Sequence, residues 1–347
     1  MDYLSEKARR LTPYVAGIQP KETGWIKLNT NENPYPPSPK VVKALQELDM
    51  GKLRLYPDTL GGPLPGAIAQ SFGIEKENVF CGNGSDEVLA LAFQAFYSGR
   101  KGVLMPDVSY GFYPVWAEIY DIGVKLVPLC DDLTINPDNY KGGAGVVLAN
   151  PNAPSSIALS LSDIEKIVRN NSDAVILVDE AYIDFANVGS AVSLVAKYEN
   201  LLVVRTFSKS HSLAGLRAGY AIGARTLIEG LRRIKDAFNS YPLGLPAQTG
   251  ATAAIFDRDY WEQTRSRIIT TRDQAAQRLR QLGYRVFDSQ TNFLLMETPN
   301  AKGLYEYLLG NKILARYWDK PRISTFLRVT IGTDDEMEAF LKCVSRF

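Results

Sequence analysis

The sequence predicts an α/β protein: a mostly parallel sheet sandwiched by helices forms a large domain, with a smaller α+β C-terminal domain and an N-terminal arm. The first observation is a series of short apolar runs, rich in Val, Ile and Leu, that helix-length segments separate. This pattern is typical of parallel strands buried on both faces. The second observation is a change of rhythm near residue 240, after which one long helical segment precedes several short strands.

Three parts follow from this pattern. Residues 1–39 lack a sustained period and contain the proline-rich run Tyr35-Pro36-Pro37-Ser38-Pro39, so we expect an extended arm. Residues 40–240 form the large domain, with strands predicted at 78–80, 102–105, 125–129, 145–149, 174–178, 201–205 and 219–223. Residues 241–347 form the small domain, with a helix over 257–282 ending at Gly283, strands at 284–287, 292–297, 313–318 and 326–331, and a closing helix over 334–347.

Composition excludes several classes of protein. The 347 residues are 46% hydrophobic and 22% charged, which is ordinary for a globular protein. Thirty-nine basic and 38 acidic side chains give a net charge of +1, too little to hold a nucleic acid or an anionic membrane. The expected partners are therefore small molecules or a second copy of the chain.

Cysteine and histidine usage points away from metals and disulfides. Cys81, Cys130 and Cys343 are odd in number and far apart, which fits a reducing cytoplasm. The single histidine, His211, excludes zinc hydrolases that use two or three histidines. The sequence has neither a signal-peptide h-region nor a long apolar run, so we expect a cytoplasmic protein with no metal and no membrane segment.

Chemistry is concentrated at the ends of three predicted strands. Asp179, Lys209 and the segment Asn150-Pro151-Asn152 each follow an apolar run, and ligands of open α/β sheets bind beyond the carboxyl ends of the strands. Singly, Asp179 is explained as a helix cap and Lys209 as a surface lysine. Together with Arg217, they meet the three needs of pyridoxal phosphate: a lysine for a Schiff base, a carboxylate for the pyridine nitrogen and a guanidinium for the phosphate.

The run Cys81-Gly82-Asn83-Gly84-Ser85-Asp86-Glu87 is a second candidate phosphate site. The amides of Gly84, Ser85 and Asp86 would open an apolar helix and point at an anion, although a plain capping turn is the alternative. Glu87 stands where a dinucleotide fingerprint needs its third glycine, which disfavours a dehydrogenase. Tyr110 offers a ring that could stack on a flat cofactor, with a core tyrosine as the alternative.

The motifs resemble those of the fold-type I pyridoxal-phosphate aminotransferases, and within them those of the histidinol-phosphate branch. The superfamily signal is Arg205-Thr206-Phe207-Ser208-Lys209. The branch signal is the arm, with Lys27-Leu28-Asn29 and Asn31-Glu32-Asn33-Pro34, and the segment from Arg316 to Arg328. Further matches are Thr12-Pro13-Tyr14, Tyr56-Pro57-Asp58, Val178-Asp179-Glu180-Ala181-Tyr182, Leu213-Ala214-Gly215-Leu216-Arg217 and Asn292-Phe293.

The resemblance implies a role for each matching residue. Lys209 would be the Schiff-base lysine and proton shuttle, Asp179 the partner of the pyridine nitrogen, and Tyr182 a donor to the ring hydroxyl. Tyr110 would stack on the ring of the cofactor. The cofactor phosphate would be held by Gly84, Ser85, Asp86, Ser208 and Arg217, and by Tyr56 of the neighbouring subunit of a homodimer. Arg328 would hold the substrate anions, with Arg316 and Tyr14 assisting on the phosphate of histidinol phosphate. The implied reaction converts histidinol phosphate and 2-oxoglutarate to imidazole acetol phosphate and glutamate.

One motif departs from the family. The asparagine that normally bonds the ring hydroxyl falls on Ala153, so either Asn152 or Tyr182 alone would serve. Three other functions stay open: an aminotransferase for aromatic amino acids, a lyase similar to threonine-phosphate decarboxylase, and a non-catalytic regulator that binds the cofactor. A satisfied turn or interface residue is the expected role of His211.

Overall fold

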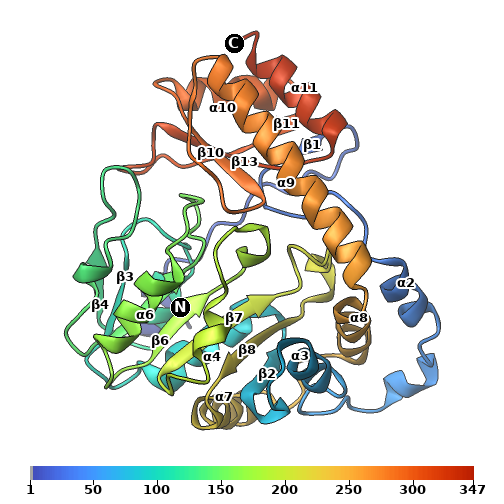
Figure 1. Ribbon diagram of the computed structural model, residues 1–347, viewed down its shortest axis with the longest axis vertical. Helices are drawn as coiled ribbons and strands as arrows, with labels where there is room; N and C mark the ends of the chain where they lie inside the picture. Colours follow the sequence, from blue (N-terminus) through green and yellow to red (C-terminus); the bar gives the residue numbers. More distant parts are fainter. Residues whose placement is uncertain (1–2) are drawn as a thin grey trace.

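The large sheet is mostly parallel, as predicted. The structure is a computed structural model that describes residues 3–347, so the first two residues of the predicted arm lie outside it. The strand order is β2-β8-β7-β6-β5-β3-β4, and β8 runs antiparallel to both of its neighbours (Figure 1). The strands are β2 (Val79–Gly82), β3 (Val103–Pro106), β4 (Val124–Val127), β5 (Gly145–Ala149), β6 (Ile176–Asp179), β7 (Leu201–Thr206) and β8 (Gly219–Gly223).

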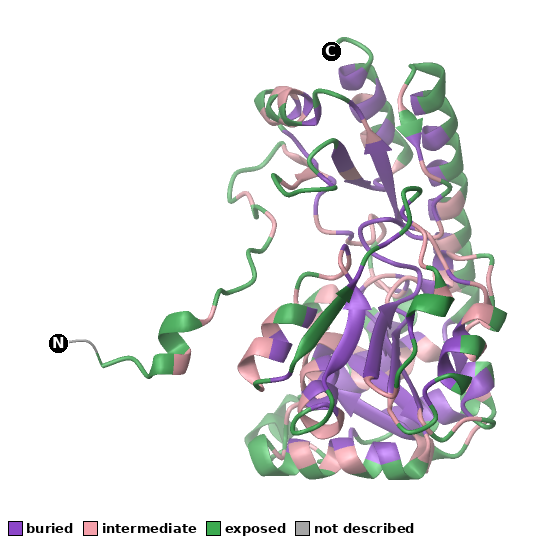
Figure 2. Cartoon of the chain, turned by 90° about the vertical axis from the view of Figure 1, so that its left-hand side faces the viewer, coloured by how far each residue is buried: buried purple, intermediate pink, exposed green. Residues whose placement is uncertain are grey.

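Helices cover both faces of this sheet. Alternate residues of each central strand accordingly pack into different hydrophobic clusters, one on each face. In β5, Val146 and Leu148 belong to one cluster, while Val147 and Ala149 belong to another. The inner strands of the central sheet are buried in Figure 2, whereas the edge strand β4 is mostly exposed. The helices of this part are α2 (Pro39–Gln46), α3 (Leu64–Phe72), α4 (Gly84–Phe96), α5 (Tyr113–Ile119), α6 (Leu161–Arg169), α7 (Arg225–Phe238) and α8 (Leu245–Ile255).

The C-terminal part is built on a small antiparallel sheet of order β12-β13-β10-β9. The long helix α9 runs from beside α8 up to this sheet (Figure 1) and is followed by Gly283 at φ 91°, the glycine stop that the sequence predicts. The elements are α9 (Arg258–Gln281), β9 (Arg285–Val286), β10 (Phe293–Glu297), α10 (Ala301–Gly310), β12 (Arg316–Tyr317), β13 (Phe326–Thr330) and α11 (Asp334–Val344).

Two expectations about local structure were wrong. The predicted strand 313–318 is split, because β11 (Ile313–Leu314) pairs with β1 (Ile26–Lys27) of the arm while β12 pairs with β13. The arm is not extended throughout, since it contains the short helix α1 (Glu6–Arg10). Ser5 caps this helix, and Lys7 and Arg10 form ion pairs with Asp121, which lies just after α5.

The domain boundaries near residues 39 and 240 stay predictions. Phe185, from the part that carries the large sheet, packs in the hydrophobic cluster of the C-terminal part. None of the helices between residues 3 and 347 combines the length and apolar character needed to span a bilayer.

Candidate active site

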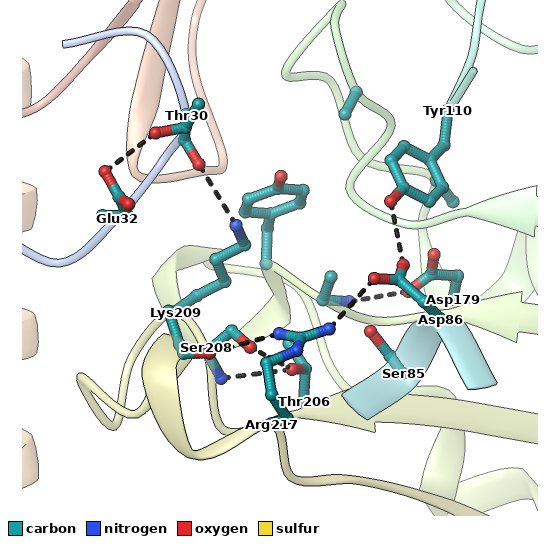
Figure 3. Close-up of a pocket in the computed structure, with 15 residues that line it drawn as sticks. Thr30, Glu32, Ser85, Asp86, Tyr110, Asp179, Thr206, Ser208, Lys209 and Arg217 are labelled. Atoms are coloured by element: carbon teal, nitrogen blue, oxygen red, sulfur yellow. Dashed lines mark hydrogen bonds and ion pairs between the residues drawn. The ribbon is translucent and has the colours of Figure 1, made fainter. Parts of the chain in front are cut away.

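A cavity of about 180 Å³ opens where β5, β6 and β7 end and α4 begins. It joins the carboxyl edge of the large sheet to a segment of the arm (Figure 3). Its lining consists of Thr30, Glu32, Ser85, Asp86, Tyr110, Ala149, Ala153, Asp179, Ala181, Tyr182, Thr206, Ser208, Lys209, Ala214 and Arg217. The strand-end side chains Asp179 and Lys209 therefore share one cavity, as parallel strands at adjacent positions require.

Asp179 is a buried carboxylate at the last position of β6. Its Oδ2 accepts a hydrogen bond from the Tyr113 hydroxyl at 2.8 Å, and its Oδ1 accepts one from the Ala181 amide at 3.1 Å. Burial raises the pKa of Asp179 to about 6, although these two bonds oppose the shift. A carboxylate held in this way gains stability from any cation that enters the cavity.

Lys209 lies on the loop that follows β7. Asn33 of the arm holds the main chain of this loop by donating from Nδ2 to the Lys209 carbonyl at 3.0 Å. The Lys209 ammonium donates to the Thr30 carbonyl over a long 3.4 Å and lies 5.6 Å from the centre of the Tyr182 ring (Figure 3). This long bond is a weak anchor and uses one of the three N–H groups of the ammonium. The lysine is therefore available to the cavity.

The start of α4 and Arg217 together form a cradle for an anion. Gly84 opens the helix at φ 80°, and a Cβ there would lie 2.6 Å from Nη2 of Arg217. The guanidinium therefore packs directly on the glycine backbone, which a larger residue would prevent. Arg217 also donates to Asp86 at 3.1 Å, and the Ser208 side chain lines the same end of the cavity (Figure 3). A helix N-terminus beside a guanidinium suits a phosphate.

Two tyrosines flank the space between Asp179 and the arm. The Tyr110 hydroxyl donates to Asp86 at 2.9 Å (Figure 3). Burial is the largest cause that raises the Tyr110 pKa far above its usual value, and the neighbouring Asp86 carboxylate adds to the shift. The Tyr182 ring packs edge-to-face on Phe293, and its hydroxyl accepts a hydrogen bond from Asn31 at 2.9 Å. Both rings are held in place by packing, which favours a flat ligand.

The two predicted substrate arginines lie on neighbouring strands. Arg328 of β13 and Arg316 of β12 are directly opposite each other. Arg328 donates to the Asn29 carbonyl at 2.7 Å, and burial lowers its pKa. Its Nε is buried and has no hydrogen-bond partner among residues 3–347. An unsatisfied buried donor is costly, so this guanidinium is suited to an incoming anion.

The family model of the class I and II aminotransferases matches residues 23–344. This chain belongs to the class I and II aminotransferases. The resemblance inferred from the motifs is confirmed. The chain is 47% identical over 342 residues to the histidinol-phosphate aminotransferase of Clostridium acetobutylicum, a match that covers 98% of this chain and 97% of the relative. It is 49% identical over 343 residues to that of Marinomonas sp., covering 97% of each chain.

A solved structure shares the fold of this aminotransferase. The histidinol-phosphate aminotransferase of Sinorhizobium meliloti, in complex with pyridoxal-5'-phosphate, aligns with a TM-score of 0.90 at 20% identity, covering 100% of this chain and 97% of that one. Among the residues that the structure describes, no three His, Cys, Asp or Glu side chains gather closely enough to hold a metal ion.

Three predicted cofactor residues of the aminotransferase do not line the cavity: Gly84, which lies under the Arg217 guanidinium, Asn152 and Tyr56. The Asn152 side chain is buried in local hydrogen bonds: it accepts from Ser109 and donates to the Val108 carbonyl and to Ser155. Ala153 lines the cavity and Asn152 does not, so a role of Asn152 at the ring hydroxyl stays a prediction. The Tyr56 side chain is 82% exposed. Its ring stacks on that of Tyr241.

Tyr14, the third predicted substrate residue, packs against two aromatic residues near the cavity. Its ring stacks on Phe112 at 4.3 Å and is tilted against Tyr110. Arg316 donates to the neighbouring arm carbonyls, Val15 at 3.0 Å and Ala16 at 3.5 Å. The arm therefore contacts both parts of the chain beside the cavity.

Sequence reasoning missed several residues of the site. Thr30 and Glu32 come from the arm, and Tyr113 was visible only as a neighbour of Tyr110. The arm motif around Asn31 signalled the family branch without indicating which side chains face the cavity. His211 is half-buried and packs between Phe207 and Trp261, and desolvation lowers its pKa to about 4. This packing agrees with the structural role expected for it.

Proposed function

We propose that this aminotransferase converts histidinol phosphate and 2-oxoglutarate to imidazole acetol phosphate and glutamate with pyridoxal 5'-phosphate as cofactor. The observation that carries the proposal is the meeting of Lys209, Asp179 and Arg217 around one cavity. The full-length similarity to histidinol-phosphate aminotransferases selects the substrate among related amino compounds. An aminotransferase for aromatic amino acids and a lyase similar to threonine-phosphate decarboxylase are therefore not favoured.

The residues of the cavity fit pyridoxal phosphate. A buried carboxylate with a raised pKa suits a protonated ring nitrogen, and the start of α4 with Arg217 suits the phosphate group. When bound, the cofactor supplies a conjugated ring that accepts the electron pair released at the substrate carbon. The residues that would hold the phosphate are Gly84, Ser85, Asp86, Ser208 and Arg217; those that would hold the ring are Tyr110, Asp179, Tyr182 and Lys209.

Two side chains would handle the protons of the reaction. Asp179, as a carboxylate, would keep a proton on the ring nitrogen, because the opposite charge favours both ionised forms. Lys209 would bind the cofactor covalently through Nζ. Once released by the substrate amine, the same Nζ would take a proton from the substrate carbon and deliver it elsewhere on the substrate–cofactor pair. The weak hydrogen bond of this ammonium to Thr30 leaves it mobile enough to do so.

Arg328 would bind an anion of each substrate in turn. Its partially unsatisfied guanidinium fits the carboxylate of glutamate or the phosphate of histidinol phosphate. Arg316 and Tyr14 would assist with the phosphate, which has more oxygens and more charge. Since Arg316 also holds two carbonyls of the arm, substrate binding and the position of the arm would be linked.

We also propose that two chains form a homodimer in the cytoplasm, with Tyr56 reaching the cofactor phosphate of the partner subunit. Tyr56, Leu55 and Met50 are large hydrophobic residues exposed on neighbouring segments of one chain. Such exposure is typical of a surface that another protein covers. The three free cysteines suit a reducing compartment.

Steady-state assays with histidinol phosphate, phenylalanine and threonine phosphate, run side by side with 2-oxoglutarate, test the proposal. We expect kcat/KM to be highest for histidinol phosphate, with glutamate formed in equal amount to the imidazole product. Release of carbon dioxide from threonine phosphate would indicate the lyase instead. Faster turnover of phenylalanine would contradict the substrate assignment and leave the aminotransferase assignment standing.

A further inference from the structure

We propose that Asn31 of the arm is a positioning residue that fixes the direction of the Tyr182 hydroxyl. The inference rests on the proposed function, in which Tyr182 donates a hydrogen bond to the ring hydroxyl of the cofactor. It assigns a task to the motif Asn31-Glu32-Asn33-Pro34, which in the sequence alone signals only the family branch.

The arm segment around Asn31 contacts several proposed active-site residues. The Asn29 carbonyl accepts from Arg328, the Thr30 carbonyl accepts from Lys209, and Asn31 Nδ2 donates to the Tyr182 hydroxyl oxygen at 2.9 Å. The arm therefore reaches the proposed proton-transfer and anion-binding groups through consecutive residues. Of these three contacts, the one from Asn31 is made by a side chain, so substitution can remove it without deleting the backbone.

Thr330 determines the orientation of the Asn31 side-chain amide. The backbone N–H of Asn31 donates to Thr330 Oγ1 at 2.9 Å, so the Thr330 hydroxyl hydrogen is free to point elsewhere. That hydroxyl donates to Asn31 Oδ1 at 3.0 Å, which makes Oδ1 the acceptor and leaves Nδ2 facing Tyr182. Because Nδ2 can only donate, the Tyr182 oxygen must accept from it. The Tyr182 hydroxyl hydrogen is then directed away from Asn31, and Tyr182 is one of the residues that line the cavity.

The backbone at position 31 narrows the choice of residue further. Asn31 is 1% exposed and has φ 57°, in the left-handed region that Gly, Asn and Asp tolerate best. Asn292 holds its carbonyl with a hydrogen bond of 3.0 Å, which fixes this conformation. Of the three tolerated residues, only asparagine also supplies an N–H donor to Tyr182. The backbone and the hydroxyl direction together therefore require asparagine.

The test is the pH midpoint at which the absorption band of the cofactor changes in the purified holoenzyme. In Asn31→Asp, a carboxylate oxygen faces the Tyr182 hydroxyl and captures its hydrogen. The ring oxygen then loses a donor and holds neighbouring protons more tightly. We expect the midpoint to rise by about half a pH unit or more, the shift that one lost hydrogen bond produces. Asn31→Gly keeps the backbone conformation without adding charge, and should raise the midpoint by a smaller amount.

The variants Tyr182→Phe and Asn31→Asp/Tyr182→Phe complete a double-mutant cycle. If Asn31 acts through the hydroxyl, the shift caused by Asn31→Asp shrinks to its through-space charge effect in the Tyr182→Phe background. Equal shifts in both backgrounds would overturn the inference. An unchanged midpoint in Tyr182→Phe would instead contradict the proposed role of Tyr182, so the two failures are distinguishable.

Asn29→Ala is the matched control. Asn29 is also a buried asparagine of the arm, and its Nδ2 donates at the same 2.9 Å, but to the Ile18 carbonyl and away from Tyr182. We expect this variant to leave the pH midpoint unchanged even if the arm is destabilised. A shift as large as that of Asn31→Asp would show that general loosening of the arm explains the result, and would overturn the inference.

Discussion

Asp179→Asn should separate the stability of the cofactor-free protein from its activity. Burial raises the pKa of Asp179 from 3.8 to about 6, so between these values the folded protein retains a proton that the unfolded chain releases. The stability of the wild type therefore falls as pH rises through this window, and the full cost is present above the folded pKa. A shift of about 2 units corresponds to about 3 kcal/mol of unfolding free energy.

The asparagine variant has no charge to bury and escapes this cost. It keeps one acceptor for Tyr113 or Ala181 and loses the other bond, at about 1 kcal/mol at every pH. We therefore expect the variant to be slightly less stable than wild type near pH 4 and more stable by about 2 kcal/mol near pH 8. Transamination should be severely reduced, because a neutral amide cannot hold a proton on the ring nitrogen.

Urea unfolding of the two proteins without cofactor, at one protein concentration and several pH values, measures this difference. Glu180, whose pKa burial raises to about 7, and His211 also titrate, but their contributions largely cancel between the two proteins. A stability difference that stays constant from about pH 4 to about pH 8 would refute the reasoning, because it would mean that the Asp179 pKa is not raised by burial.

Three further predictions concern cofactor attachment, substrate anions and assembly. Lys209→Ala should abolish covalent retention of the cofactor after borohydride reduction, measured by mass spectrometry, together with transamination; retained turnover would remove the central proposal. Arg328→Ala should lower kcat/KM for both glutamate and histidinol phosphate, with a loss of transition-state stabilisation of about 2 to 4 kcal/mol. Arg316→Ala should raise KM mainly for histidinol phosphate, and single-turnover measurements that show equal effects would contradict this. Tyr56→Phe should weaken cofactor binding without changing the dimer seen by sedimentation; a fully active wild-type monomer would exclude a shared site.

The sequence by itself determined the class of fold and the chemical components of the site. Alternating apolar runs and helix-length segments identify a covered parallel sheet, because burial of both faces of a strand leaves a direct record in composition. The strand-end positions of Asp179 and Lys209 follow from the same pattern, since adjacent parallel strands end at one edge. Both residues line the cavity.

Only the tertiary structure decided which polar side chains face the cavity. Asn152 and Ala153 are neighbours in the chain, but local hydrogen bonds turn the asparagine away and leave the alanine at the cavity wall. The pairing of β1 with β11 places the arm beside strands almost 300 residues further along the chain. Asn31 thereby meets Thr330 and Tyr182. The direction of a buried amide depends on such long-range partners, which no local pattern in the sequence specifies.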